Sequence, residues 1–373
     1  MKRIGIITMH AVRNYGSYLQ TYALYKYLEL LGYEVFIIDY KFPLEYHKSL
    51  HINNGTKTLE PKWFEKKIAG LCSRIVRLNP DLYEQRMASF YKNNMNFTRP
   101  YESIEALVCN PPIFDVYITG SDQVWNPYWV GADTNFLLSW VGQNKLKISY
   151  AASFAIKELP KKYNDLYYKY LRQYNNISIR EESDILKKMG LHGKVVLDPT
   201  FLLDRDEWQK IIPSKPLIGG KYILCYLLRY SYDPYPYANK VIAWVKKKLK
   251  CKVIIIGPEV KSILKGYTVL PNCGPIEFLN LFFNASFIIT SSFHGTSFAI
   301  NFQKNFFTII DDKKTLDNRQ ISLINMLDIP QSCVIKKNTL LKDLTMPNLD
   351  YSKLMKIGQK RNESRQFLEN AIK

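Results

Sequence analysis

Paired cysteines are absent from this sequence of 373 residues. Six cysteines occur, but no two of them form a C-x-x-C pair, and they are scattered at Cys72, Cys109, Cys225, Cys251, Cys273 and Cys333. Structural zinc sites and disulfide frameworks normally show regular cysteine spacing. The chain is therefore expected to carry single structural thiols and no metal site.

Long hydrophobic runs are also missing. No segment approaches the ~18 consecutive apolar residues that a membrane-spanning helix requires. The best candidate is interrupted by polar side chains at Glu277, Asn280, Asn284 and His294. The first residues, MKR before a short apolar stretch, do not have the form of a signal peptide. We therefore expect a cytoplasmic protein, with peripheral contact at the inner face of a membrane left open.

Acidic residues are scarce relative to basic ones. The 52 lysines and arginines exceed the 33 aspartates and glutamates, which gives a formal net charge of +19. Such an excess favours anionic partners, namely nucleic acid, phosphorylated metabolites or an anionic membrane. The sequence contains no RRM or zinc-finger motif, and its basic residues are spread along the chain. Nucleic acid is therefore not expected as a partner.

Strand-like and helix-like patterns alternate twice along the chain, which is long enough for two hydrophobic cores. Predicted strands of the first half lie at 3–8, 35–39, 115–120, 147–153, 177–180 and 195–199. After a linker rich in Pro and Gly at 204–220, further strands are predicted at 222–228, 252–257, 287–290 and 306–310. The pattern predicts an α/β protein with two Rossmann-like domains. Their boundaries are 1–205, with an insertion at about 41–112, and 206–350, followed by a C-terminal helix at 351–373.

The stretch at 287–302, FIITSSFHGTSFAINF, combines a buried strand, a small polar loop and a helix. The strand is expected to stop at two serines, and the helix is expected to begin around a small polar triplet: Ser291, Ser292, Gly295, Thr296 and Ser297. The carboxyl edge of an open α/β sheet is where ligands bind, and the N–H groups that begin a helix suit an anion. An imidazole at His294 could exchange a proton there near neutral pH. A buried core histidine is the alternative.

The N-terminal βαβ unit has a small-residue loop between its first strand and a helix predicted at 18–31. Asn14 and Gly16 lie in this loop, where phosphates or sugars commonly bind. The loop is not G-x-G-x-x-G, so a dinucleotide is not expected. Gly16 could instead simply permit a tight turn.

Two further strand ends carry polar residues. The string GSDQVWN at 120–126 places Ser121, Asp122 and Gln123 after a strand, where their donors and acceptors suit sugar hydroxyls. Asp122 could alternatively cap the next helix in an Asx turn. Arg180 lies at the tip of the strand at 177–180, and its planar fork of donors fits a carboxylate or a phosphate. A neighbouring glutamate, Glu181 or Glu182, could instead pair with it.

One segment of the insertion has helical periodicity with basic residues between its apolar positions. Between residues 61 and 78 the apolar positions recur at helical spacing, and several lysines and arginines separate them. Such a helix could lie on an anionic membrane. Packing of its apolar face on its own domain is the alternative.

Taken in order, these motifs resemble the polysaccharide pyruvyl transferase family. The strings that carry the resemblance are NYG at 14–16, GSDQVWN at 120–126, KISYAAS at 147–153, SIREES at 178–183, VVLDP at 195–199 and SSFHGT at 291–296. The resemblance covers most of the chain apart from 41–112 and the C-terminal end. It implies a GT-B-like fold, in which two Rossmann-like domains face a central cleft.

The resemblance also implies an activity and a set of partners. The enolpyruvyl group of phosphoenolpyruvate would be transferred to two hydroxyls of a sugar, forming a cyclic pyruvate ketal in the synthesis of capsular polysaccharide, exopolysaccharide or another cell-surface glycan. Phosphoenolpyruvate is then the donor substrate and no cofactor is expected. The acceptor sugar would be lipid-linked or part of an oligosaccharide. A GT-B glycosyltransferase that uses a nucleotide-sugar, and a non-catalytic carbohydrate-binding assembly protein, are the alternatives.

Residue roles follow from the same resemblance. His294 and Arg180 are the expected catalytic residues, His294 as the acid and base and Arg180 as a ligand of the donor. The expected donor site consists of Arg180, Ser291, Ser292, His294, Gly295 and Thr296, and the expected acceptor site of Asn14, Gly16, Ser121, Asp122 and Gln123. Many members carry arginine where this chain has Ser292. If the donor needs a second cation, another residue must provide it.

Overall fold

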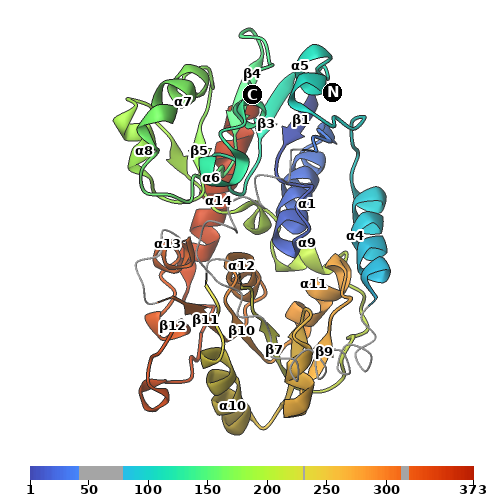
Figure 1. Ribbon diagram of the computed structural model, residues 1–373, viewed down its shortest axis with the longest axis vertical. Helices are drawn as coiled ribbons and strands as arrows, with labels where there is room; N and C mark the ends of the chain where they lie inside the picture. Colours follow the sequence, from blue (N-terminus) through green and yellow to red (C-terminus); the bar gives the residue numbers. More distant parts are fainter. Residues whose placement is uncertain (42–78, 230–231, 312–318) are drawn as a thin grey trace, which may run out of the picture. The chain divides into compact units, whose positions relative to one another are not determined.

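The computed structural model describes residues 1–41, 79–229, 232–311 and 319–373, and these residues form two compact units (Figure 1). Unit 1 contains residues 1–41, 92–203 and 356–373, and unit 2 contains residues 79–91, 204–229, 232–311 and 319–355. The basic segment predicted at 61–78 lies outside the described residues. In the part of the chain that is described, none of the helices combines the length and hydrophobicity required of a transmembrane span.

Within its described residues, unit 1 contains a four-stranded parallel sheet in the order β2-β1-β3-β4. The strands are β1 (Arg3–Ile7), β2 (Glu34–Ile37), β3 (Val116–Thr119) and β4 (Leu146–Ser149). Two short strands, β5 (Ser178–Ile179) and β6 (Lys194–Val195), pair with each other in parallel. The chain starts at β1, adds β2 on one side and then returns to β3 on the other. The carboxyl ends of β1 and β3 therefore form the switch point where open α/β sheets bind ligands.

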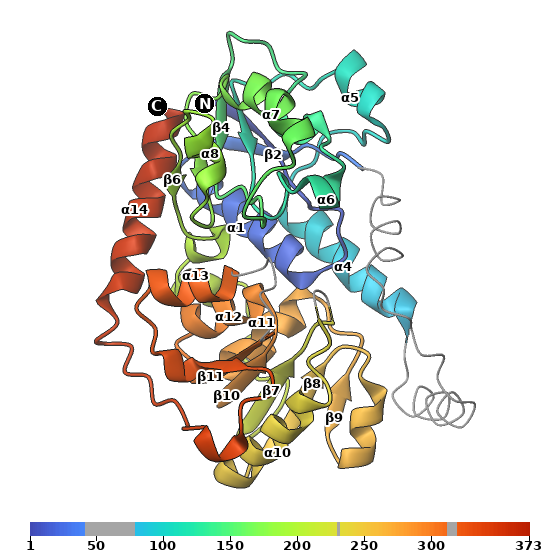
Figure 2. The ribbon, with the colours of Figure 1, turned by 60° about the vertical axis from the view of Figure 1, so that its left-hand side comes forward.

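Helices of unit 1 connect and cover these strands. They are α1 (Tyr15–Leu30), α5 (Ile104–Cys109), α6 (Pro127–Val130), α7 (Asn164–Leu171), α8 (Asp184–Lys188), α14 (Met355–Ile372) and the 3-10 helices η1 (Thr134–Leu137), η2 (Lys161–Tyr163) and η3 (Pro199–Phe201). The C-terminal helix α14 packs beside α1 (Figure 2), where the Tyr27 hydroxyl donates to Glu369 at 2.6 Å. Ser364 accepts a hydrogen bond from the amide of Leu197 at 2.9 Å. The predicted C-terminal helix thus forms, and it belongs to unit 1 although it follows unit 2 in sequence.

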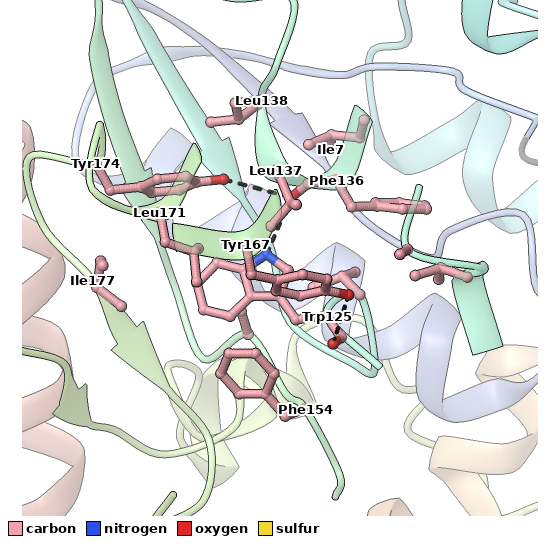
Figure 3. Packing of buried hydrophobic residues seen from close by; sticks show 14 of the residues in the cluster. Ile7, Trp125, Phe136, Leu137, Leu138, Phe154, Tyr167, Leu171, Tyr174 and Ile177 are labelled. Carbon is pink, nitrogen blue, oxygen red and sulfur yellow. Dashed lines mark hydrogen bonds between the residues drawn. The ribbon is translucent and has the colours of Figure 1, made fainter. Parts of the chain in front are cut away.

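Trp125 of the GSDQVWN motif lies within the aromatic core of unit 1 (Figure 3). Trp125 is fully buried, and its indole N–H donates to the carbonyl of Phe136 at 3.2 Å. The Tyr167 hydroxyl donates to the carbonyl of Trp125 at 3.1 Å, and Tyr174 meets the indole edge-on. Burial of such large rings, with each polar atom paired, fixes the loop that precedes them.

Among the described residues of unit 2, a six-stranded parallel sheet has the order β12-β11-β10-β7-β8-β9. Its strands are β7 (Tyr222–Tyr226), β8 (Lys252–Ile256), β9 (Thr268–Leu270), β10 (Phe287–Thr290), β11 (Phe306–Ile310) and β12 (Val334–Lys336). The chain starts in the middle at β7, continues outward to β9 and returns to β10 beside β7. The switch point of this sheet therefore lies at the carboxyl ends of β7 and β10.

The helices of unit 2 precede, connect or follow these strands. They are α4 (Pro80–Asn94), α9 (Arg205–Gln209), α10 (Tyr237–Leu249), α11 (Pro275–Asn284), α12 (Phe293–Asn301), α13 (Arg319–Met326) and the 3-10 helices η4 (Val260–Lys265), η5 (Gln331–Cys333) and η6 (Leu341–Asp343). α10 packs on one face through Val241, Ile242 and Val245. α11 and α12 cover the other face (Figure 2), where the Phe278 ring contacts those of Tyr226 and Phe298.

Two helices begin earlier than the sequence predicts, and a side-chain cap explains each. α1 begins at Tyr15 instead of residue 18, because the Asn14 side chain accepts a hydrogen bond from the amide of Gly16 at 2.8 Å. α12 begins at Phe293 instead of Gly295, because Ser292 is its N-cap. The residues just after Asn14 and Ser292, which were expected to lie in loops, therefore form the first turns of α1 and α12.

Most of helix α4 belongs to unit 2, although the predicted insertion at 41–112 was assigned to the N-terminal domain. The Arg86 guanidinium donates to the carbonyl of Asn272 at 2.7 Å and pairs with Glu277 at 3.2 Å. These contacts connect segments that are far apart in sequence, and local pattern does not reveal them.

Candidate functional site

The switch point of unit 1 is built from the loop after β3 and the start of α1. Asp122 adopts a left-handed backbone conformation, with φ of 74°, which aspartate tolerates better than most residues. The Ser17 hydroxyl donates to the Asp122 carboxylate at 2.9 Å. Ser121 turns away and donates to the carbonyl of Ala151 at 2.8 Å. The loop thus brings the Asp122 carboxylate to the sheet edge, while Ser121 fastens β3 to the segment after β4.

Arg180 lies among carboxylates in this unit. Its Nη1 donates to Asp198 at 3.1 Å, its Nη2 lies 3.6 Å from Asp122 and its Nε lies 3.8 Å from Glu181. The guanidinium is only 2% exposed and the Asp198 side chain is completely buried. Each of the three guanidinium nitrogens of Arg180 therefore faces a different carboxylate, as the planar and rigid geometry of the guanidinium group allows.

Hydrogen-bond donors hold two of these carboxylates in place. Asp198 accepts from the amide and the hydroxyl of Thr200 at 3.0 and 2.8 Å. Glu181 accepts from the Ser153 hydroxyl at 2.7 Å and from the amide of Ala155 at 3.0 Å. These bonds fix the carboxylate oxygens in position around the guanidinium. Carboxylate oxygens accept hydrogen bonds from hydroxyl groups, so the cluster is suited to contact the hydroxyls of a ligand.

The other predicted acceptor residues have structural partners. Asn14 caps α1 and Gly16 is part of its first turn. The side-chain amide oxygen of Gln123 accepts a hydrogen bond from the Asn126 side chain at 2.8 Å. All three lie near the switch point of unit 1, but their visible contacts are those of a loop and a helix start.

A histidine–aspartate pair at the same sheet edge was not predicted from the sequence. His10 follows β1 and is 1% exposed, and its Nε2 lies 2.9 Å from the carboxylate of Asp39, which follows β2. Burial acts to raise the pKa of Asp39, but hydrogen bonds from His10 and Lys41 outweigh it and leave that pKa below its ordinary value. A histidine and an acid at the ends of adjacent predicted strands were the signal that could have revealed the pair.

The switch point of unit 2 is a network of short polar side chains. The Ser291 hydroxyl accepts from the amide of Leu228 at 2.8 Å and donates to its carbonyl at 3.0 Å. The Thr296 hydroxyl donates to the carbonyl of Ser292 at 3.0 Å and forms a second hydrogen bond with the Thr308 hydroxyl at 2.9 Å. These bonds connect the ends of β7, β10 and β11 to the start of α12.

Backbone amides at the start of α12 also have partners. The amide of Gly295 donates to the Ser292 hydroxyl at 3.3 Å, and that of Thr296 donates to the carbonyl of Ser292 at 2.9 Å. A Cβ atom at position 295 would lie 2.2 Å from the Thr290 hydroxyl oxygen, so glycine is needed for this close packing. Gly295 and Thr296 therefore shape the helix start, and binding of an anion by their amides would require them to exchange partners.

His294 is the second residue of α12 and lies in the first turn of the helix, two residues after the N-cap Ser292. It is 6% exposed, and its ring meets that of Phe293 edge-to-face, with 5.2 Å between the centroids. The structure therefore places His294 at the carboxyl edge of the sheet, as the sequence predicts.

Two buried residues at the start of α13 were missed by sequence reasoning. The Gln320 side chain donates to the carbonyl of Ser291 at 3.0 Å. The Arg319 guanidinium lies over the Phe293 ring, with its Cζ 5.7 Å from the centroid. Both are less than a tenth exposed. Nothing in the local pattern around residue 319 marks these side chains, because α13 reaches the site through tertiary packing.

Neither a set of metal ligands nor a reactive thiol is found at the two edges among the residues that the structure describes. In the described ranges, no group of three or more His, Cys, Asp and Glu side chains could hold a metal ion. Burial raises the pKa of both the Cys273 and the Cys333 thiol to about 12, so these thiols are poor nucleophiles at neutral pH.

Comparison with known families agrees with the motif order. A model of the polysaccharide pyruvyl transferase family matches residues 14–312, which is most of the chain. A search of curated proteins gives no significant match.

Solved structures resemble the chain in fold. A UDP-N-acetylglucosamine 2-epimerase from Rickettsia bellii aligns with a TM-score of 0.51 at 11% identity, covering 100% of this chain and 97% of that one. A further UDP-N-acetylglucosamine 2-epimerase has the same TM-score and identity, with 99% and 95% covered. At this identity the likeness concerns the fold alone. It confirms a GT-B-like α/β protein with two Rossmann-like domains.

Proposed function

Because the chain belongs to the polysaccharide pyruvyl transferase family, we propose that it transfers the enolpyruvyl group of phosphoenolpyruvate to two hydroxyls of a sugar. The observation that carries the proposal is the start of α12, where a capped helix places His294 at the switch point of the unit 2 sheet. A ligand site at this edge is expected of the fold, and a histidine is suited to proton transfer near neutral pH.

The reaction requires a balanced set of proton transfers. One proton is added to the methylene carbon, which becomes a methyl group, and C2 is attacked by one sugar hydroxyl. Phosphate then leaves C2, and the second hydroxyl takes its place to close the ketal. Each hydroxyl loses its proton as it attacks: one of these protons replaces the proton added to the methylene carbon, and the other leaves with the phosphate as hydrogenphosphate. His294 is proposed to donate the first proton and then to accept one from a hydroxyl.

The acidic cluster of unit 1 supports a role with the sugar. A carboxylate accepts hydrogen bonds from hydroxyl groups, and Asp122 is held at the sheet edge by Ser17. We assign the acceptor hydroxyls to Asp122, whereas contacts of the acceptor with Ser121 and Gln123 stay predictions, because both side chains bond within the protein. A direct contact of Arg180 with the donor stays a prediction, since the guanidinium already faces Asp122, Glu181 and Asp198.

Partners and location follow from charge and chemistry. The acceptor is proposed to be a lipid-linked sugar or an oligosaccharide, met at the cytoplasmic face of a membrane. The net charge of +19 supports contact with anionic lipid there. Sedimentation with vesicles of phosphatidylserine, compared with vesicles of phosphatidylcholine, measures this contact. Equal binding to both vesicle types, or to neither, would contradict it.

The activity is tested by incubating the protein with phosphoenolpyruvate and a panel of lipid-linked and synthetic hexosides. Release of phosphate together with a product heavier than the acceptor by one pyruvate ketal is the expected result. Parallel reactions contain UDP-N-acetylglucosamine in place of phosphoenolpyruvate. Release of UDP in those reactions, with no ketal formed in the others, would instead identify a nucleotide-sugar glycosyltransferase.

A further inference from the structure

The start of helix α13 is tied to the loop after β10. Gln320 holds it there by donating to the carbonyl of Ser291, and its neighbour Arg319 is 9% exposed. Helices α12 and α13 pack against each other in unit 2. Arg319 is thus held by tertiary packing at the switch point of the sheet, on a different element from His294.

Arg319 and His294 contact the same aromatic ring. The Arg319 Cζ lies 5.7 Å from the centroid of Phe293, and the His294 ring lies 5.2 Å from that centroid. The two groups therefore lie no further apart than the sum of these distances, about 11 Å. Phe293 restricts the positions open to both, so their separation is set by packing.

The proposed donor carries a carboxylate and a phosphate, and the short polar residues of this edge are engaged within the protein. The hydroxyl of Ser292 caps α12, and that of Ser291 bonds to Leu228. An arginine fits a phosphate through two parallel hydrogen bonds. A cation withdrawn from water also interacts more strongly with an anion than an exposed one does.

We propose that Arg319 binds the phosphate of the donor and stabilises it as it leaves, in place of an arginine at position 292. This inference rests on the proposed function, because it takes phosphoenolpyruvate as the donor. It assigns the second cation of the donor site to a helix that follows the SSFHGT motif by more than twenty residues.

The test is isothermal titration of the full-length protein with phosphoenolpyruvate, inorganic phosphate, pyruvate and UDP. Wild type is compared with Arg319→Gln and Arg319→Lys. The matched control is Lys252→Gln, which removes one positive charge at the amino end of β8, at the opposite edge of the same sheet. Circular dichroism and thermal melts establish that each variant is folded.

Loss of a charge-assisted contact should raise the Kd of Arg319→Gln for phosphoenolpyruvate and for phosphate by about 10-fold or more. The Kd values of Arg319→Lys for these two ligands should lie between those of Arg319→Gln and wild type, and the Kd values of Lys252→Gln should equal those of wild type. Binding of pyruvate should change little, because pyruvate lacks the phosphate.

Other outcomes overturn the inference in distinguishable ways. If wild type binds phosphoenolpyruvate and folded Arg319→Gln binds it equally well, Arg319 is not a donor ligand and the proposed function stands. If the variant loses affinity for pyruvate but not for phosphate, the assignment to the phosphate is wrong. If wild type binds UDP and not phosphoenolpyruvate, both the proposed function and the role of Arg319 fail.

Discussion

The parallel sheets of the two units each have a switch point beside their first strand, but the charged side chains at the two switch points differ. In unit 1 the edge presents the carboxylates of Asp122, Glu181 and Asp198 around Arg180. In unit 2 the edge presents the imidazole of His294 and the guanidinium of Arg319, with hydroxyls engaged in the loop. Parallel sheets with a switch point determine where a ligand can bind, and the residues at the strand ends determine which ligand. From this comparison we propose that unit 1 binds hydroxyl groups and that unit 2 binds anions.

Removal of the positive charge of Arg180 in unit 1 should have the largest effect on stability. Arg180→Met leaves buried carboxylates without a counter-charge, and we expect the free energy of unfolding of unit 1 to fall by about 3–5 kcal/mol. Urea denaturation followed by tryptophan fluorescence measures this change, since Trp125 lies in the core of that unit.

Arg180→Lys separates the two roles considered for Arg180. Lysine retains the charge but cannot face three carboxylates as a planar fork does. A positioning role predicts lower stability and a raised KM for the sugar. A contact with the donor predicts a raised KM for phosphoenolpyruvate, and an unchanged value would rule that contact out.

Replacement of the histidine of unit 2 should mainly affect turnover. We expect His294→Ala and His294→Gln to lower kcat by about 10²-fold or more, which is the usual scale for a lost acid–base group. Glutamine can form hydrogen bonds but cannot transfer a proton at neutral pH, so it separates catalysis from positioning. Phosphate release under saturating substrates provides the measurement.

If His294 only packs in the core, its replacement should instead lower the free energy of unfolding by about 1–3 kcal/mol, and activity should return at lower temperature. A folded His294→Gln variant with near-native turnover would end the acid–base assignment.

Replacement of the Asp122 carboxylate by a neutral amide should weaken the use of the acceptor sugar and leave the binding of phosphoenolpyruvate unchanged. Asp122→Asn preserves the shape and tolerates the left-handed backbone at this position. We expect kcat/KM for the sugar to fall by about 10-fold, as loss of a charge-assisted hydrogen bond predicts, with no change in the KM for phosphoenolpyruvate. Steady-state kinetics with each substrate varied in turn checks this. An effect confined to phosphoenolpyruvate would reverse the assignment of the two edges.

The smallest effect is expected at the cap of α12. Ser292→Ala removes the hydroxyl that accepts from the amide of Gly295, which should cost about 1 kcal/mol of stability. Ser292→Asp retains a cap but adds a negative charge, and it should weaken phosphoenolpyruvate binding while stability is preserved. If Ser292→Ala lowers donor affinity with no loss of stability, Ser292 is a donor ligand and not a structural cap.

Much of the fold could be predicted from the sequence because its strands are continuous apolar runs that end at small polar residues. The strands at 287–290 and 306–310 were predicted with the observed bounds, and the strand predicted at 35–39 is observed at Glu34–Ile37. Helix starts were less accurate, since Asn14 and Ser292 act as caps through side-chain bonds that a turn motif also permits. The boundary between the units was predicted at 205/206, and the structure has it after Leu203.

The sequence by itself determined most of the described strands, although not β9 or β12, because strand periodicity is local, and it placed Asp122, Arg180 and His294 at or just after strand ends. Only the tertiary structure decided what surrounds them. Asp198 reaches Arg180, His10 meets Asp39 and Arg319 contacts Phe293 through packing between segments separated in the chain. Electrostatic character depends on such distances, because Coulomb energies fall with separation and rise with burial. A motif therefore fixes the position of an ionisable group, while its charge environment comes from residues that the motif does not contain.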